Sequence, residues 1–186
     1  MDFFEKAYLL NPSNSVLNYI GCCYIGLEKY YKAIEVFESL IHTTHWEAPW
    51  YNIGRAHMKP GNYDDSLKCF NEALKINPNC DDCHFYLGVY YEKKEEYETA
   101  IEFYKSAVGL CTNKEDKAMY YTNIGICYEN MSDNEISHLY FDRAMEIRKT
   151  HKDSYANNSK SSKHPGCSEE TYDISKEKNC IMTVIM

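Results

Sequence analysis

The sequence predicts an all-α protein in which antiparallel helix pairs stack into a solenoid, and three observations support this fold class. Similar residue types recur along the chain at spacings of 33 to 37 residues, which is typical of helical repeat arrays. The apolar positions within each recurrence follow helical spacing. Hydrophobic residues make up 44% of the 186 residues, which is enough for a packed array and excludes a wholly disordered chain.

Four glycines mark a common origin for the recurrences: Gly21, Gly54, Gly88 and Gly125. Ile or Leu precedes each glycine, and Tyr or His follows three positions later. Twelve positions after the glycine a small residue recurs: Ala33, Ser66, Ala100 and Ser137. Sixteen positions after it an aromatic residue recurs: Phe37, Phe70, Tyr104 and Phe141. Because four copies keep one register, the pattern indicates a structural repeat.

Each recurrence is predicted to form a helical hairpin. The positions around the glycine share one face of a first helix, and the later small and aromatic positions share one face of a second helix. The turn is clearest at residues 59–62, where Pro60 ends the first helix and Gly61 can adopt a positive φ. The glycine, facing a small residue on the second helix, should let the two backbones approach while aromatic rings fill the space beside them.

These residues resemble the signature of the tetratricopeptide repeat family over roughly residues 1–148. One unit holds residues in most of the signature positions: Trp50, Ile53, Gly54, His57, Tyr63, Ser66, Phe70, Ala73 and Pro78. The departures from the family pattern are mild: Ser66, Ser137 and Leu40 stand in place of alanine, and His45 and Thr112 stand in place of the closing proline. The resemblance implies a right-handed superhelical solenoid with a concave groove.

The repeat register divides the chain into a half repeat, four hairpins and a tail. The hairpins are expected at about 14–46, 47–80, 81–114 and 118–149. Residues 1–12 match the second helix of a preceding unit, so the chain should begin with half a hairpin. Its uncovered apolar face predicts self-association or membership of a longer solenoid. Residues 150–186 are expected to be a flexible polar tail that can form a short helix at 168–179.

Charge and cysteine content narrow the function classes. The formal net charge of -8, from 20 Lys+Arg and 28 Asp+Glu, disfavours binding to nucleic acid. Neither a signal peptide nor a membrane span is recognisable, so no membrane association is expected. The odd count of nine cysteines without an export signal indicates reduced thiols in a cytoplasmic protein.

Catalytic and metal-binding motifs are mostly missing from the sequence. It contains no phosphate-binding glycine loop, H-E-x-x-H or G-x-S-x-G, so we expect neither an enzyme nor a cofactor. Cys80, Cys83 and His84 match the C-x-x-C-H string, but His84 occupies a packing position of the repeat. A metal or redox role for Cys80 and Cys83 is the lesser alternative, and zinc would need a further ligand such as Cys111.

The resemblance also implies a peptide-binding strip on the inner face of the first helices. In this chain the strip would comprise Tyr51, Arg55, Met58, Phe85, Val89, Met119 and Ile126. Such apolar side chains beside one cation suit an extended or helical peptide with apolar anchors. The alternative is that neighbouring first helices bury one another's strip. The expected function is a non-catalytic adaptor or scaffold that binds a peptide segment of a partner protein.

Two narrower functions can be weighed from the residues. Chaperone-binding members of the family grip an acidic C-terminus with Lys, Asn and Arg, and the matching positions here are Asn18, Cys22, Asn52, Asp82 and Tyr86. Only Asn52 fits, and Asp82 would repel the ligand, so no binding of Hsp70 or Hsp90 C-terminal peptides is expected. The second function is a structural segment of a larger solenoid or multi-subunit assembly that makes contacts through its stacking ends.

Overall fold

The computed structural model describes residues 13–43 and 45–161. The predicted half repeat at 1–12 and the helix expected at 168–179 lie outside the described residues. Side chains are described as far as Thr150, and residues 151–161 are described by their backbone alone.

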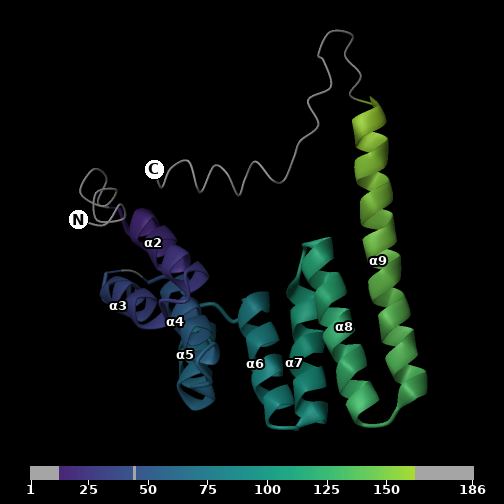
Figure 1. Cartoon of the computed structure of the whole chain (residues 1–186), viewed down its shortest axis with the longest axis horizontal. Coiled ribbons are helices and arrows are strands. Elements are labelled where there is room, and N and C mark those ends of the chain that lie inside the picture. The colour runs from purple at the N-terminus through teal and green to yellow at the C-terminus, as the bar shows by residue number, and fades with distance from the viewer. Residues whose placement is uncertain (1–12, 44, 162–186) are drawn as a thin grey trace.

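All regular structure in the described residues is helical, which confirms the predicted fold class (Figure 1). The helices are α2 (Asn14–Gly26), α3 (Tyr30–Ile41), α4 (Ala48–Met58), α5 (Tyr63–Ile76), α6 (Asp81–Lys93), α7 (Tyr97–Leu110), α8 (Lys114–Asn130) and α9 (Asn134–Ser161). Successive helices pair as α2–α3, α4–α5, α6–α7 and α8–α9, and each packs chiefly against its neighbours in the chain. The molecule is therefore a solenoid of antiparallel helix pairs.

The first helix of every hairpin ends in the same turn. Seven positions after each repeat glycine a residue adopts a positive φ: Glu28, Gly61, Glu95 and Ser132. In the third hairpin, the amide of Glu96 donates to the carbonyl of Tyr91 at 2.9 Å, and the amide of Glu95 donates to the carbonyl of Glu92 at 3.0 Å. The other three turns repeat both bonds. This Schellman pattern satisfies the last carbonyls of the helix and reverses the chain.

The repeat glycines lie against the aromatic residue sixteen positions later. A Cβ atom on Gly54 would stand 2.6 Å from the Phe70 ring, and one on Gly125 would stand 2.6 Å from the Phe141 ring. The first three aromatic residues of this set are fully buried: Phe37, Phe70 and Tyr104. The atoms closest to each glycine thus belong to the ring sixteen positions later. The sequence had instead predicted close contact between the glycine and the small residue twelve positions later. Packing of small against large residues joins the two helices.

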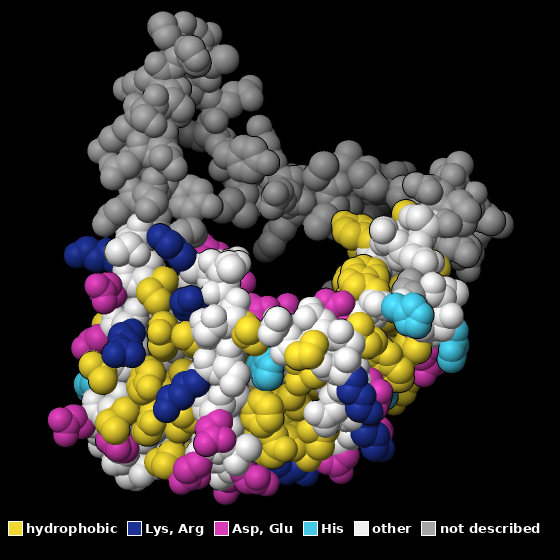
Figure 2. All heavy atoms as spheres, turned by 180° about the vertical axis from the view of Figure 1, so that it is seen from behind, with side chains coloured by type: hydrophobic (Ala, Val, Ile, Leu, Met, Phe, Trp, Pro, Cys, Tyr) yellow, Lys and Arg dark blue, Asp and Glu magenta, His cyan; other side chains and the backbone are white. Residues whose placement is uncertain are grey.

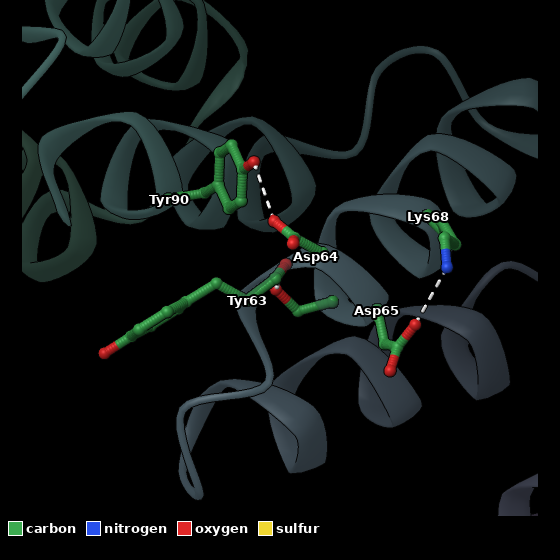
Figure 3. A network of polar contacts seen from close by, with 6 residues as sticks. Tyr63, Asp64, Asp65, Lys68 and Tyr90 are labelled. Atoms are coloured by element: carbon green, nitrogen blue, oxygen red, sulfur yellow. Dashed lines mark hydrogen bonds and ion pairs between the residues drawn. The ribbon is translucent and has the colours of Figure 1, made fainter. Parts of the chain in front are cut away.

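Two side-chain contacts near the hairpin turns join the second and third hairpins. The hydroxyl of Tyr90 on α6 donates to the Asp64 carboxylate on α5 at 3.2 Å (Figure 3). The ammonium group of Lys94 lies 3.5 Å from the same carboxylate and 5.6 Å from the centre of the Tyr90 ring. Because Asp64 and Lys94 are exposed, their ion pair adds little stability.

The final helix is longer than the sequence predicts. The flexible tail was expected from residue 150, but α9 continues to Ser161. The reason is that no proline or glycine interrupts residues 134–161, so the backbone hydrogen bonds of the helix continue after the repeated packing positions end. The end of α9 consequently projects past α8 (Figure 1). This corrects the predicted boundary between repeat and tail.

Candidate functional site

The predicted groove residue Phe85 belongs to the core. Its side chain is only 9% exposed and its ring stacks on Tyr120 of α8, with the ring centres 5.0 Å apart. Tyr104 lies on another side, with the ring centres 5.7 Å apart. The prediction that Phe85 anchors a peptide is therefore wrong, because the next hairpin covers it. This is the alternative in which neighbouring helices bury one another's strip.

The other predicted groove residues retain access to solvent. Met119 is 38% exposed. The remaining members are half-buried: Tyr51, Arg55, Met58, Val89 and Ile126. The guanidinium carbon of Arg55 lies 5.4 Å from the centre of the Tyr51 ring, and the Tyr51 ring in turn contacts Tyr86 of α6 at 5.8 Å between ring centres. The structure thus brings Tyr51 and Arg55 together, while Val89 packs at the edge of the α6–α8 core.

A polar chain connects the first two hairpins beside this pair. Arg55 Nη1 donates to Asn52 Oδ1 at 3.2 Å, and Asn52 Nδ2 donates to Asn18 Oδ1 at 3.1 Å. Asn52 is 3% exposed, so its amide is committed to neighbouring side chains. These bonds orient the half-buried guanidinium of Arg55. Its planar N–H donors suit a carboxylate or a carbonyl oxygen.

Asp82 joins three hairpins at this face, a role that sequence reasoning missed. The hydroxyl of Tyr120 on α8 donates to Asp82 Oδ1 at 3.5 Å. Partial burial raises the pKa of Asp82, as do Asp81 and Asp116, while a hydrogen bond from Tyr51 on α4 and the charge of Arg55 lower it. The net direction is upward. The side chain nevertheless remains exposed, which leaves an acidic group one hairpin away from Arg55.

The Cys80–Cys83 segment lies at the start of α6. His84 Nε2 lies 3.1 Å from the carbonyl oxygen of Pro78, and its ring lies beside Phe103. Cys111 donates from Sγ to the carbonyl oxygen of Asn113 at 3.3 Å. In the part of the chain that the structure describes, no three His, Cys, Asp or Glu side chains form a group that could hold a metal ion. The geometry therefore lends no support to the zinc alternative.

The last hairpin exposes the face on which another repeat would stack. Met145 of α9 is 58% exposed, whereas Val108, at the equivalent position of α7, is half-buried. Seen from behind, hydrophobic and basic side chains intermingle over the α8–α9 end (Figure 2). This end of the array is consequently a second candidate contact surface. Among the described helices, none has the length and hydropathy needed to cross a bilayer.

The helix pairs repeat in one register, and the residues described above lie on the inner face of their first helices. A solenoid of this kind belongs to the class used for protein–protein interaction and scaffolding. Residues 51–115 match the family described as tetratricopeptide repeat. This part of the chain thus carries tetratricopeptide repeats, and the same glycine, aromatic and turn positions recur in the hairpins on either side of it.

Curated relatives share this repeat over part of their length. The chain is 25% identical over 146 residues to the TPR repeat-containing protein MJ1428 of Methanocaldococcus jannaschii, covering 78% of this chain and 22% of the relative. It is 31% identical over 109 residues to anaphase-promoting complex subunit 3 of Schizosaccharomyces pombe, covering 58% and 15% respectively. The chain therefore spans less than a quarter of the length of these relatives.

Solved structures show the same fold. A crystal structure of MamA superposes with a TM-score of 0.67 at 21% identity, covering 81% of this chain and 87% of that one. The crystal structure of the APC/C hetero-tetramer Cut9–Hcn1 superposes with a TM-score of 0.70 at 17% identity, covering 77% and 29%. At these identities the likeness establishes the arrangement of helices alone.

Proposed function

We propose that this chain is a non-catalytic cytoplasmic scaffold that binds a peptide segment of a partner protein on the inner face of α4, α6 and α8. The observation that carries the proposal is the placement of Arg55 against Tyr51, one hairpin away from the exposed carboxylate of Asp82. A cation and a carboxylate on consecutive hairpins can each pair with an opposite charge of a bound segment, which fixes the direction in which the segment binds.

Apolar side chains next to these charges supply the anchoring surface. Met119 and Ile126 of α8 and Val89 of α6 keep part of their surface in contact with solvent. Burial of such side chains under a peptide releases about 25 cal/mol for each Å² of apolar surface covered. The preferred ligand is therefore a segment that combines apolar anchors with an acidic residue for Arg55 and a basic residue for Asp82.

Selection of peptides on the full chain tests this function. Displayed random peptides that bind the protein would be titrated against Arg55→Glu and Asp82→Lys, with Arg143→Glu on α9 as the matched charge reversal. Arg143 is exposed but also lies over a tyrosine, Tyr140, so the control matches the ring contact of Arg55. We expect losses of at least about tenfold in affinity for the two inner-face variants and no loss for the control.

Circular dichroism should show the same helicity for all three variants. Selected peptides that bind both inner-face variants as tightly as the parent chain would refute the assignment. Substitution of Phe85 is avoided because a charge at this buried site would disrupt the core.

The exposed end of α9 favours a second function, that of a structural segment within a larger assembly. Val108 is half-buried, whereas Met145 at the same repeat position is 58% exposed. Sedimentation of the full chain as a function of concentration distinguishes the two functions. A self-association that Met145→Glu abolishes and Arg55→Glu leaves intact would favour contacts through the stacking end, and a monomer at all concentrations would argue against self-stacking.

A further inference from the structure

Two cysteine side chains meet where the chain enters α6. Cys80 is the N-cap residue of this helix, and its Sγ accepts a hydrogen bond from the amide of Cys83 at 3.2 Å. The two Sγ atoms lie 2.6 Å apart. An S–S bond is about 2.0 Å long, so the two sulfurs lie about 0.6 Å from bonding distance. A small adjustment at the start of α6 is therefore enough to join the pair.

The two thiols differ in access to solvent. Cys83 is completely buried, whereas Cys80 is half-buried and presents its sulfur at the helix end. A reagent from solution consequently reaches Cys80 first. Cys83, directly behind it, is shielded from the reagent but in contact with the Cys80 sulfur. This order suits an attacking thiol followed by a resolving thiol.

The surroundings also separate the two sulfurs chemically. Hydrogen bonds from the Cys83 side chain and amide lower the pKa of Cys80, and they outweigh burial and the nearby carboxylates of Asp82 and Glu47, which raise it. The hydrogen bond with Cys80 and burial raise the pKa of Cys83. The amides at the start of a helix further favour a thiolate there.

Other cysteines of the described chain lack this combination. Burial is the main cause that raises the pKa of these thiols. It raises the pKa of Cys22 and Cys23 above the ordinary value. It raises the pKa of Cys69 and of Cys111 to about 11, and that of Cys127 to about 12. Cys22 and Cys23 are adjacent in sequence and half-buried, so they provide an internal comparison.

We propose that Cys80 and Cys83 form a reversible dithiol–disulfide site that is oxidised by low-molecular-mass disulfides such as oxidised glutathione. The Cys80 thiolate attacks one sulfur of the glutathione disulfide, forms a mixed disulfide and releases one glutathione thiolate. Cys83 then gives up its proton and attacks the Cys80 sulfur, which releases the second glutathione. Two protein thiols are oxidised by two electrons, and one glutathione disulfide is reduced to two thiols. The site is independent of the peptide-binding proposal.

Differential alkylation and mass spectrometry of the reduced full chain test this site. After incubation with oxidised glutathione, we expect a peptide in which Cys80 and Cys83 are joined and two hydrogen atoms are lost, with Cys69 and Cys127 still alkylated. Dithiothreitol should restore both thiols. A wild-type protein in which both thiols remain free, or in which glutathione stays attached to Cys80, would overturn the proposal.

Single substitutions separate the two roles. Cys83→Ser should trap one glutathione on Cys80, because the resolving thiol is missing. Cys80→Ser should be modified at Cys83 at least about tenfold more slowly, because this thiol is buried. A double Cys22→Ser and Cys23→Ser variant should form the 80–83 disulfide as the parent does. Equal modification of the two single variants, or tightly bound zinc that protects both thiols in the reduced protein, would refute the assignment.

Discussion

The ring of Tyr104 lies against Gly88, with Cε1 only 2.5 Å from the position that a Cβ atom on this glycine would occupy. Tyr104 is fully buried, and its hydroxyl donates to the Glu92 carboxylate at 2.6 Å. The ring is therefore fixed both by its packing against Gly88 and by the hydrogen bond of its hydroxyl. Any side chain at position 88 must displace a rigid, hydrogen-bonded aromatic group from the centre of the third hairpin.

Gly88→Leu is expected to lower the free energy of unfolding by more than about 1–3 kcal/mol, the range found for overpacked cores. Urea unfolding followed by circular dichroism measures this change. Gly109→Ala is the matched control, because nothing lies within 4 Å of its added Cβ atom. This alanine should stabilise α7 by about 0.5–1 kcal/mol. An unchanged stability for Gly88→Leu would contradict the observed pairing of glycine and ring.

The repeat glycines and the recurring aromatic positions were predictable because the hairpin core repeats in one register, whereas their direct contact was not. The inner face was less predictable. Helical spacing placed Phe85 and Val89 on one face of α6, but it does not reveal how closely α8 approaches that face. Both residues were consequently predicted to line the peptide-binding strip, although Phe85 is buried and Val89 keeps contact with solvent. The bond from Tyr120 to Asp82 depends on the same approach between hairpins and carries no sequence signal.

A turn was predicted in all four hairpins, but a positive φ was predicted only at Gly61, although each of the four turns has one. Gly61 is a recognisable turn residue, whereas Glu95 and Ser132 are not, although all have a positive φ. Alignment on the repeat glycines is the signal that finds them. The left-handed conformation costs a residue with a Cβ atom about 1–2 kcal/mol, so two hairpins of the α6–α9 half carry backbone strain at equivalent positions.

Glu95→Gly is accordingly expected to raise the free energy of unfolding by up to about 1 kcal/mol, after the greater flexibility of glycine in the unfolded chain is subtracted. Gly61→Ala makes the reverse change at the equivalent turn and should lower it by about 1 kcal/mol. Urea titrations of the two variants and the parent protein measure both effects. Stabilisation by both substitutions, or by neither, would show that the positive φ does not govern turn stability.

Asp82 predicts a specific dependence of stability on pH. The folded state raises its pKa above the ordinary value of 3.8, so the folded protein binds this proton more tightly than the unfolded chain. The ionised carboxylate therefore lowers stability at neutral pH, and this effect disappears as the pH falls through the raised pKa and below 3.8. Asp82→Asn should thus have a higher thermal midpoint than the parent at pH 7, with the difference shrinking in acid.

Thermal unfolding of both proteins across this pH range provides the measurement. Asp65→Asn serves as the control, because Lys68 lowers the pKa of that exposed carboxyl and the sign of its contribution is opposite. A gap between Asp82→Asn and the parent that widens on acidification would contradict the assigned direction.

The projecting end of α9 predicts a helix that can be broken without unfolding the array. This helix has 28 residues and α8 has 17, so about 16 Å of α9 extends past its partner at 1.5 Å per residue. Ala156→Pro should remove helical signal at 222 nm while the thermal midpoint stays unchanged. Leu139→Pro places the same residue at an exposed site within the paired part of the helix, where it should destabilise by about 3 kcal/mol or more. Equal loss of midpoint in the two variants would mean that the end of α9 is held by further contacts.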